Sequence, residues 1–231
     1  MRGKTAIFGN RKTVTYNSNH WKLLEKKRRR AVEVAEKIAD FSPVLYGSVA
    51  RGDVTELSDI DLFIPESIPS YRIEVALDSF EILKRRIIQA TPNYAIKGEF
   101  VLEDETTVSF PLVRIKQREM DFYKFGGAVS FDELLRSKRV PGVDKRLVMI
   151  LPKNEGHDEI PLNEMQINEI SKILNIGIEI IEERIRVLER RREIGRTGVF
   201  LCEEISPDES FESRLKLIAK KNPNVKRRLM S

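Results

Sequence analysis

Cysteine is nearly absent from this sequence. Cys202 is the single cysteine among 231 residues, which excludes an intramolecular disulfide framework and a zinc site built from several cysteines. No apolar run approaches the length of a transmembrane helix, and the N-terminus lacks the apolar segment of a signal peptide. Internal repeats and low-complexity segments are also missing. We therefore expect a cytoplasmic globular protein without a membrane partner.

Charged side chains, by contrast, are abundant. They make up 33% of the chain beside 41% apolar residues, which is enough for a core under a heavily charged surface. The net charge of +5 and the isoelectric point near 9.2 favour a polyanionic partner such as RNA or DNA. The length fits one large domain or two modest ones, and the oligomeric state stays open.

The stretch between residues 47 and 64 is the most informative part of the chain. It contains Gly-Ser-Val-Ala-Arg-Gly, a short loop, and then Ser-Asp-Ile-Asp-Leu. On a strand, Asp59 and Asp61 share one face, and two such carboxylates repel unless a cation lies between them. A hard ion such as Mg²⁺ suits them, and the Gly47-Ser48 turn offers backbone N–H groups to phosphate. Taken alone, the aspartate pair also fits a solvated strand end.

This motif resembles the signature of the DNA polymerase beta-like nucleotidyltransferase superfamily. The likeness is sharp over residues 44–64 and looser to about 150. It implies an α+β fold, with a palm of mixed sheet and helices on one face. It also implies transfer of a nucleoside monophosphate from a nucleoside triphosphate such as ATP to a hydroxyl, releasing pyrophosphate. Finally, it implies Mg²⁺ or Mn²⁺ bound by Asp59, Asp61 and a third catalytic acid, and phosphate contacts from Gly47 and Ser48.

The third acid is expected on a neighbouring strand, and Asp121 is the first candidate. It lies between apolar Met120 and Phe122 inside residues 114–125, which we predict to form a long strand. Glu119 would share its face and is the alternative. A charged edge strand without a catalytic role would also fit this stretch.

Other polar residues have two interpretations each. Lys145 and Arg146 lie where related transferases carry basic residues that reach the triphosphate, but an ordinary solvated loop fits equally. Arg51 is more often a structural brace than a ligand in the family. We predict His157 to be a surface turn residue rather than a base.

Apolar spacing predicts the remaining elements of the first 160 residues. Helices are expected over 19–39, 73–90 and 131–137, the last capped by Ser130. Strands are expected over 44–46, 94–102 and 106–115. Together they predict a mixed sheet with helices, and the resemblance implies that residues 1–160 form a nucleotidyltransferase domain.

A second domain, small and winged-helix-like, is predicted over residues 161–205. Apolar residues keep helical spacing on two helices broken at residues 175–177, in a register that resembles a helix-turn-helix, and residues 195–201 fit a wing strand. The alternative is a plain helical hairpin. In a winged helix, the expected nucleic-acid contacts are Arg184, Arg186, Arg190, Arg192 and Arg196. Residues 206–231 are expected to form a helix, opened by residues 206–208, and a basic tail.

The resulting hypothesis is a metal-dependent nucleotidyltransferase with RNA as the first candidate acceptor. Nucleotidylation of a protein or small molecule is a second hypothesis. A third is a nucleotide-sensing regulator, whose palm binds a triphosphate without turnover while the C-terminal domain binds DNA.

Overall fold

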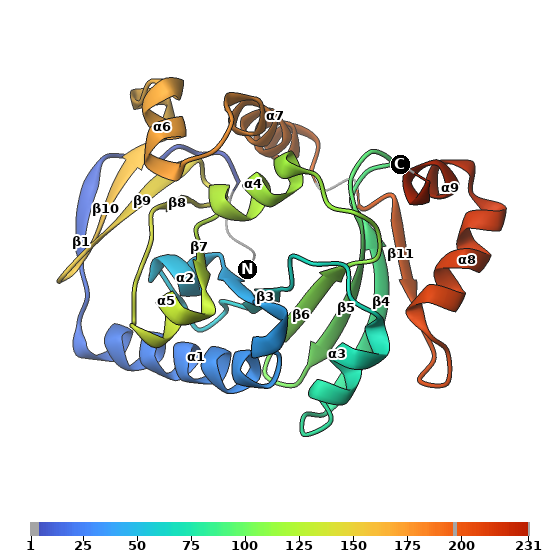
Figure 1. Ribbon diagram of the computed structural model, residues 1–231. Coiled ribbons are helices and arrows are strands. Elements are labelled where there is room, and N and C mark those ends of the chain that lie inside the picture. Colours follow the sequence, from blue (N-terminus) through green and yellow to red (C-terminus); the bar gives the residue numbers. More distant parts are fainter. Residues whose placement is uncertain (1–4, 196–197, 231) are drawn as a thin grey trace. The chain divides into compact units, whose positions relative to one another are not determined.

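The computed structural model describes residues 5–195 and 198–230 (Figure 1). The chain forms two compact units, and each combines segments that are distant in sequence. Unit 1 contains residues 1–30, 45–58 and 120–197, and unit 2 contains residues 31–44, 59–119 and 198–231. This division differs from the predicted boundaries at residues 160 and 205.

Unit 1 combines an antiparallel sheet with helices. The sheet has the strand order β1 (Lys12–Thr15), β10 (Gly156–Pro161), β9 (Val148–Lys153), β8 (Gly142–Val143). Two short strands, β2 (Val44–Tyr46) and β7 (Ala128–Ser130), are neighbours. The helices are α2 (Ser48–Arg51), α5 (Phe131–Leu135), α6 (Ile167–Leu174), α7 (Ile178–Ile194) and the 3-10 turn η2 (Leu162–Glu164). Its core packs apolar side chains of α6 and α7, including Ile170 and Ile181, against Met149 of β9.

Unit 2 is built on a mixed sheet. Its strands follow the order β11 (Leu201–Glu204), β4 (Ile82–Gln89), β5 (Ile96–Leu102), β6 (Thr106–Pro111), β3 (Ile60–Phe63). β3 is parallel to β6, and the other pairs are antiparallel. The unit also contains η1 (Ala39–Phe41), α3 (Ser70–Ala76), α8 (Phe211–Lys221) and α9 (Pro223–Leu229). Helices α1 (Ser18–Lys37) and α4 (Gln117–Phe125) contribute residues to both units.

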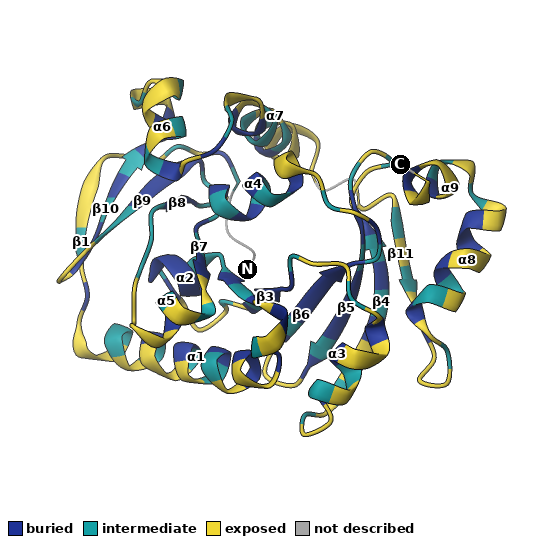
Figure 2. Ribbon diagram, in the orientation of Figure 1, coloured by how far each residue is buried: buried dark blue, intermediate teal, exposed yellow. Residues whose placement is uncertain are grey.

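One face of the unit 2 sheet holds an aromatic core. The ring centroid of Phe211 from α8 lies 5.1 Å from those of Phe100 and Phe110, and all three residues are fully buried. Figure 2 shows long buried stretches along β5 and β6. Gly98 makes this packing fit, because a Cβ at this position would lie only 2.4 Å from the Phe110 ring. The fully buried rings identify this face as the principal core of unit 2.

Several predicted elements are confirmed, including the α+β class with a mixed sheet. The strands predicted at 94–102 and 106–115 are β5 and β6. Ser130 caps α5 in a reciprocal capping box with Glu133. The break at 175–177 separates α6 from α7, with Asn175 in the left-handed conformation at φ 51°.

Two long elements were predicted wrongly. Residues 73–90 are not one helix, because α3 ends at Ala76 and residues 82–89 form strand β4, whose residues 85, 87 and 89 are buried in alternation. Residues 114–125 are not a strand, because residues 117–125 form helix α4. The carboxylate of Glu119 accepts the backbone N–H of Lys116 at 2.7 Å, which caps the first turn of this helix.

The winged helix is not confirmed. Helices α6 and α7 pack within unit 1, whereas β11 pairs with β4 in unit 2, and residues 196–197 of the expected wing lie outside the described residues. Nor do residues 206–208 open a helix, because α8 begins after its cap, Ser210.

Candidate active site

The aspartate pair lies at and just before strand β3 in unit 2. Alternation along the strand buries Ile60 and Leu62 on one side and places Asp59 and Asp61 on the other. Asp59 is exposed, and Asp61 is half-buried. The local sequence therefore produces the shared carboxylate face that the motif predicts.

The sheet register brings further charges to the same face. Phe63, which shares the face of Asp61, lies opposite Ser109 of β6, and Ser109 lies opposite Glu99 of β5. Residues opposite one another in a ladder point to the same side, so Glu99 and also Lys97 face the side of Asp61. Glu99 is buried, and Lys97 is half-buried.

Neither Glu99 nor Lys97 was among the residues predicted for the site. The available signal was their spacing of two on the strand predicted at 94–102, which places both on one face. Which face that is depends on the pairing of β5 with β6 and of β6 with β3, and the sequence does not specify this pairing.

The charges on this face are incompletely balanced. Burial raises the pKa of the Asp61 carboxyl to about 7, and the neighbouring charges of Asp59 and Glu99 raise it further, while Lys97 opposes them. Burial lowers the pKa of the Lys97 ammonium, although Glu99 and Asp61 favour its charged form. Glu99 also accepts a hydrogen bond of 2.7 Å from the guanidinium of Arg86. The face therefore carries more negative charge around Asp61 than its own cations compensate.

The glycine-serine turn of the motif lies in unit 1, at the start of α2. Gly47 adopts φ 86°, a conformation that favours glycine, and its N–H donates to the carbonyl of Gly127 at 2.9 Å. Its amide is therefore engaged within the protein, and its carbonyl accepts the N–H groups of Ala50 and Arg51. Ser48, half-buried, is the first residue of the helix.

Arg51 forms a buried brace for this turn. Its guanidinium makes two hydrogen bonds of 2.9 Å to the carboxylate of Asp53 and one to the carbonyl of Gly126. A Cβ at Gly127 would lie 2.6 Å from the Arg51 side chain, so glycine is required there. These contacts agree with the structural role expected for Arg51.

Asp121 lies on helix α4, in the part that belongs to unit 1, and is buried. Its Oδ2 accepts the backbone N–H of Gly177, the N-cap of α7, at 3.3 Å. Glu119, the alternative acid, belongs to unit 2 and pairs with buried Arg228 at 3.1 Å. Among the residues that the structure describes, no three His, Cys, Asp or Glu side chains gather as a metal site.

The other candidates are placed as follows. The guanidinium of Arg146 bonds to both carboxylate oxygens of Glu159, at 2.9 and 3.1 Å, and to Asp144, whereas Lys145 is exposed. His157 is not a surface turn residue. It lies on β10 with 3% exposure, and its Nδ1 lies 2.6 Å from the hydroxyl of Tyr16.

The predicted nucleic-acid arginines lie on α7, apart from Arg196, which is outside the described residues. Arg184 lies over the ring of Phe122, 4.8 Å from its centroid. Arg192 donates to the carbonyl of Ala6 at 3.1 Å. Arg186 and Arg190 are exposed.

Comparison with known proteins agrees with the motif. No curated protein and no solved structure matches the chain. No helix in the described part of the chain is long and apolar enough to cross a membrane. Residues 27–140 match the family model described as a nucleotidyltransferase domain, and this range contains the turn at Gly47 and both Asp59 and Asp61. This part of the chain is therefore a nucleotidyltransferase domain, which confirms the predicted enzyme class.

Proposed function

We propose that this chain transfers a nucleoside monophosphate from a nucleoside triphosphate to a hydroxyl group, releasing pyrophosphate, and that Asp59 and Asp61 hold a divalent cation for this reaction. The observation that carries the proposal is the shared face of Asp59 and Asp61, on which burial and neighbouring carboxylates raise the pKa of Asp61 to about 7. A divalent cation between these groups would relieve the repulsion that disfavours their ionised forms.

The side chains present fit a hard cation such as Mg²⁺ or Mn²⁺. Both aspartates offer carboxylate oxygens, which such ions prefer, and water or phosphate oxygens complete the coordination of Mg²⁺ in many sites. When bound, the ion would polarise the phosphate and favour ionisation of the attacking hydroxyl.

The chain's own residues have distinct roles in this proposal. Exposed Asp59 and half-buried Asp61 bind the cation. Ile60 and Leu62, buried on the opposite face of β3, hold the strand in place. Lys97, Glu99 and its partner Arg86 determine the electrostatic environment of the Asp61 carboxyl. Catalysis in such a site consists mainly of positioning and charge stabilisation at the phosphate oxygens.

Phosphate contacts are assigned to Ser48 and to Lys145. Ser48 follows the turn that Gly47 shapes, and its hydroxyl can donate a hydrogen bond to a phosphate oxygen. Lys145 is exposed and therefore accessible to a triphosphate. The contacts of Arg146 with Glu159 and Asp144 support a structural role instead.

Asp121 remains the proposed third catalytic acid, and its hydrogen bond to Gly177 supports a competing role in holding the start of α7. Glu99 is a second candidate, because it is the other acid on the face of Asp61. Changing Asp121 to Asn and Glu99 to Gln in separate variants decides between them. The third acid is the one whose variant loses transfer while its unfolding curve stays unchanged.

The experiment that tests the function is incubation with each radiolabelled nucleoside triphosphate, Mg²⁺ or Mn²⁺, and separate pools of RNA, DNA, protein and small-molecule acceptors. RNA is our first candidate acceptor, and the net charge of +5 favours a polyanion of this kind. Label in one pool, accompanied by pyrophosphate and lost in Asp61→Asn, supports transfer. Triphosphate binding without pyrophosphate release would overturn the enzymatic function and favour a nucleotide sensor.

A further inference from the structure

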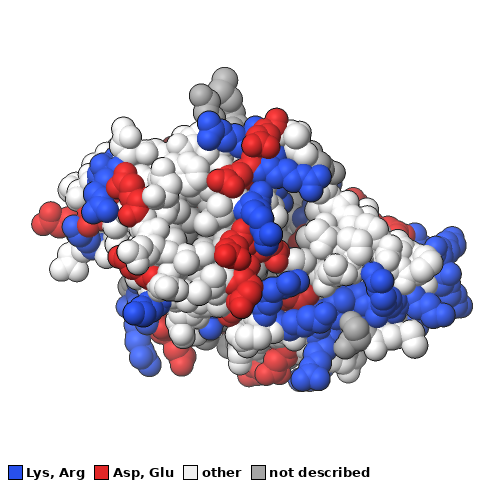
Figure 3. Space-filling model, turned by 90° about the horizontal axis from the view of Figure 1, so that it is seen from above, with Lys and Arg blue, Asp and Glu red and all other residues white. Residues whose placement is uncertain are grey.

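The C-terminal helices of unit 2 concentrate positive charge. Residues 213–230 contain no aspartate or glutamate, whereas basic residues occur throughout α8 and α9. The basic side chains are Arg214, Lys216, Lys220, Lys221, Lys226, Arg227 and Arg228. Figure 3 shows Lys and Arg side chains gathered at its right-hand side, where Figure 1 places these two helices.

Two of these arginines connect the helices to other segments of unit 2. Arg228 is buried and donates to the carbonyl of Arg114 at 2.8 Å and to the carboxylate of Glu119 at 3.1 Å. Arg214 pairs with the carboxylate of Glu203 on β11. Val225, three residues before Arg228 and therefore on the same face of α9, is fully buried. The two arginines therefore have structural partners within unit 2.

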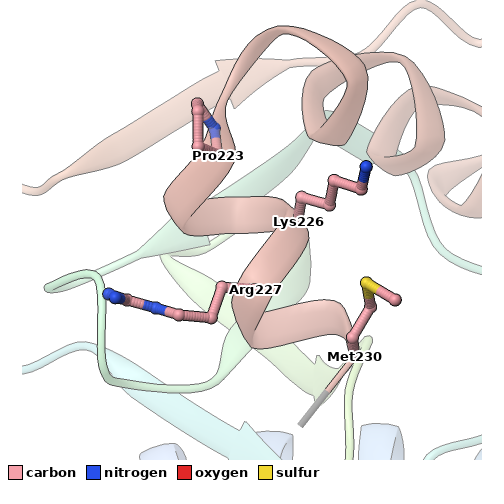
Figure 4. Close-up of a pocket in the computed structure, with 4 residues that line it drawn as sticks. All are labelled: Pro223, Lys226, Arg227 and Met230. Atoms are coloured by element: carbon pink, nitrogen blue, oxygen red, sulfur yellow. The ribbon is translucent and has the colours of Figure 1, made fainter.

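The other five basic side chains all project into solvent and form what we call the α8–α9 face: Lys216, Lys220, Lys221, Lys226 and Arg227. Within residues 5–195 and 198–230, none of the five has an ion pair, and the guanidinium of Arg227 donates a hydrogen bond to the neutral side chain of Asn224, at 3.2 Å. Lys226 and Arg227 extend away from α9 in different directions and, with Pro223 and Met230, line a shallow open hollow (Figure 4).

The helix dipole accounts for part of this charge. Lys220 and Lys221 lie in the last turn of α8, and Lys226 and Arg227 in the last turn of α9, where a positive charge interacts favourably with the helix dipole. Lys216 lies outside these turns, and a favourable dipole does not require the absence of acids from residues 213–230. The interaction with the helix dipoles therefore explains neither the charge of Lys216 nor the absence of acidic residues from 213–230.

A polyanion in solution fits this face better than a lipid surface. Membrane-surface helices place a broad apolar face in the bilayer. The apolar side chains Phe211, Leu215 and Ile218 of α8 are instead buried in unit 2. The exposed apolar side chains that remain are Leu217, Leu229 and Met230. A cluster of exposed Lys and Arg side chains at one end of a unit is the footprint of binding to nucleic-acid phosphates.

We propose that the α8–α9 face binds the phosphodiester backbone of a nucleic acid, independently of base sequence. Cations that contact only phosphates release counterions and carry no base information. The face would hold a nucleic-acid acceptor for the transfer reaction, and in this respect it rests on the proposed function. Backbone binding itself does not require turnover.

The test measures binding of a fluorescent 20-nucleotide RNA, the matching single-stranded DNA and the duplex by anisotropy at several salt concentrations. A variant with Lys216→Gln, Lys221→Gln and Lys226→Gln removes three charges from the face. Its matched control removes three exposed charges elsewhere, with Lys26→Gln, Lys37→Gln and Lys172→Gln. Far-UV circular dichroism and melting curves confirm that both variants remain folded.

We expect the face variant to weaken binding at least tenfold at low salt and to reduce the slope of log K against log salt by roughly 2 to 3. The control should change the affinity less than threefold. The preferred strand among the three probes identifies the nucleic acid. Equal losses in both variants, no binding by the unmodified protein, or selective binding to phosphatidylserine vesicles would each overturn the proposal.

Failure of the inference is separable from failure of the proposed function. Pyrophosphate release with small-molecule acceptors measures turnover without the α8–α9 face. Intact turnover with unaltered RNA affinity in the face variant would refute only the face. Selective loss of RNA binding in a protein without turnover would refute only the transferase.

Discussion

Two groups of charged residues, one in each unit, shift the pKa of a carboxyl group in opposite directions. In unit 1, Glu159 is held by two hydrogen bonds from Arg146, by Lys12 at 3.5 Å and by His157 at 3.4 Å. Although burial raises the pKa of Glu159, the bonds from Arg146 bring it below its ordinary value. In unit 2, burial and neighbouring acids instead raise the pKa of Asp61 to about 7.

These opposite pKa shifts distinguish a carboxylate that stabilises the fold from one that is available to bind a ligand. A carboxylate that the protein itself neutralises needs no ligand, whereas one surrounded by like charge is stabilised by a cation from solution. The Glu159 group should therefore matter for folding and the Asp61 group for binding and turnover. Substitutions in the two groups test this distinction, and Asp61→Asn has the largest expected effect.

Asp61→Asn should reduce nucleotidyl transfer by roughly 10³-fold, because it removes a proposed cation ligand at the reacting phosphate. The unfolding midpoint in urea should stay the same or rise, since a repulsive charge is removed. The measurement is label transfer at saturating triphosphate, with Asp132→Asn, an exposed acid on α5, as control. Full activity in Asp61→Asn would contradict the proposed role.

Glu159→Gln should lower the free energy of unfolding by about 2 kcal/mol, because Arg146 loses one of its two charged partners in a largely buried group. Transfer by the folded protein should remain within a few-fold of normal. Urea denaturation followed by fluorescence gives the first quantity, and initial rates give the second. A large loss of rate without a loss of stability would place Glu159 in the functional group instead.

The pH should control cation binding at Asp61. Below about 7 the ion must displace a proton from this carboxyl, so Mn²⁺ affinity should rise up to tenfold per pH unit and level off above that value. In the cation-free protein, the free energy of unfolding should fall as pH rises from about 4 to 7. The reason is that the folded state binds more protons than the unfolded state, whose aspartate has a pKa near 3.9.

Electron paramagnetic resonance of free Mn²⁺ measures the affinity, and urea denaturation at each pH measures the stability. Both pH dependences should disappear in Asp61→Asn. If they persist there, another group is responsible.

Lys97→Met should raise Mn²⁺ affinity by roughly fivefold, because the ammonium competes with the ion for the charge of Asp61 and Glu99. Lys97→Arg keeps the charge and should leave the affinity within twofold of normal. Isothermal titration calorimetry with Mn²⁺ measures both variants. Weaker binding in Lys97→Met would show that the lysine supports the ion instead of opposing it.

Some residues of the candidate site could be predicted from the sequence, and others could not. The carboxylate face of Asp59 and Asp61 follows from the alternation of one strand, and the glycine turn from one local motif, so both could be predicted. Glu99 and Lys97 join the site only through the pairing of three strands, which is a non-local property. Residues 114–125 were predicted as a strand because polar and apolar residues alternate around Asp121, and the capping contact of Glu119 was not recognised.

The return of β11 to the sheet of unit 2 has a consequence for biosynthesis. β11 pairs with the edge of β4, and Phe211 completes the aromatic core, so both must wait until residues 201–211 have left the ribosome. A nascent chain that ends near residue 195 would leave the β4 edge bare and the rings of Phe100 and Phe110 partly uncovered. Expression fragments that omit the C-terminal segment are therefore expected to aggregate, even though they contain every residue matched by the nucleotidyltransferase family.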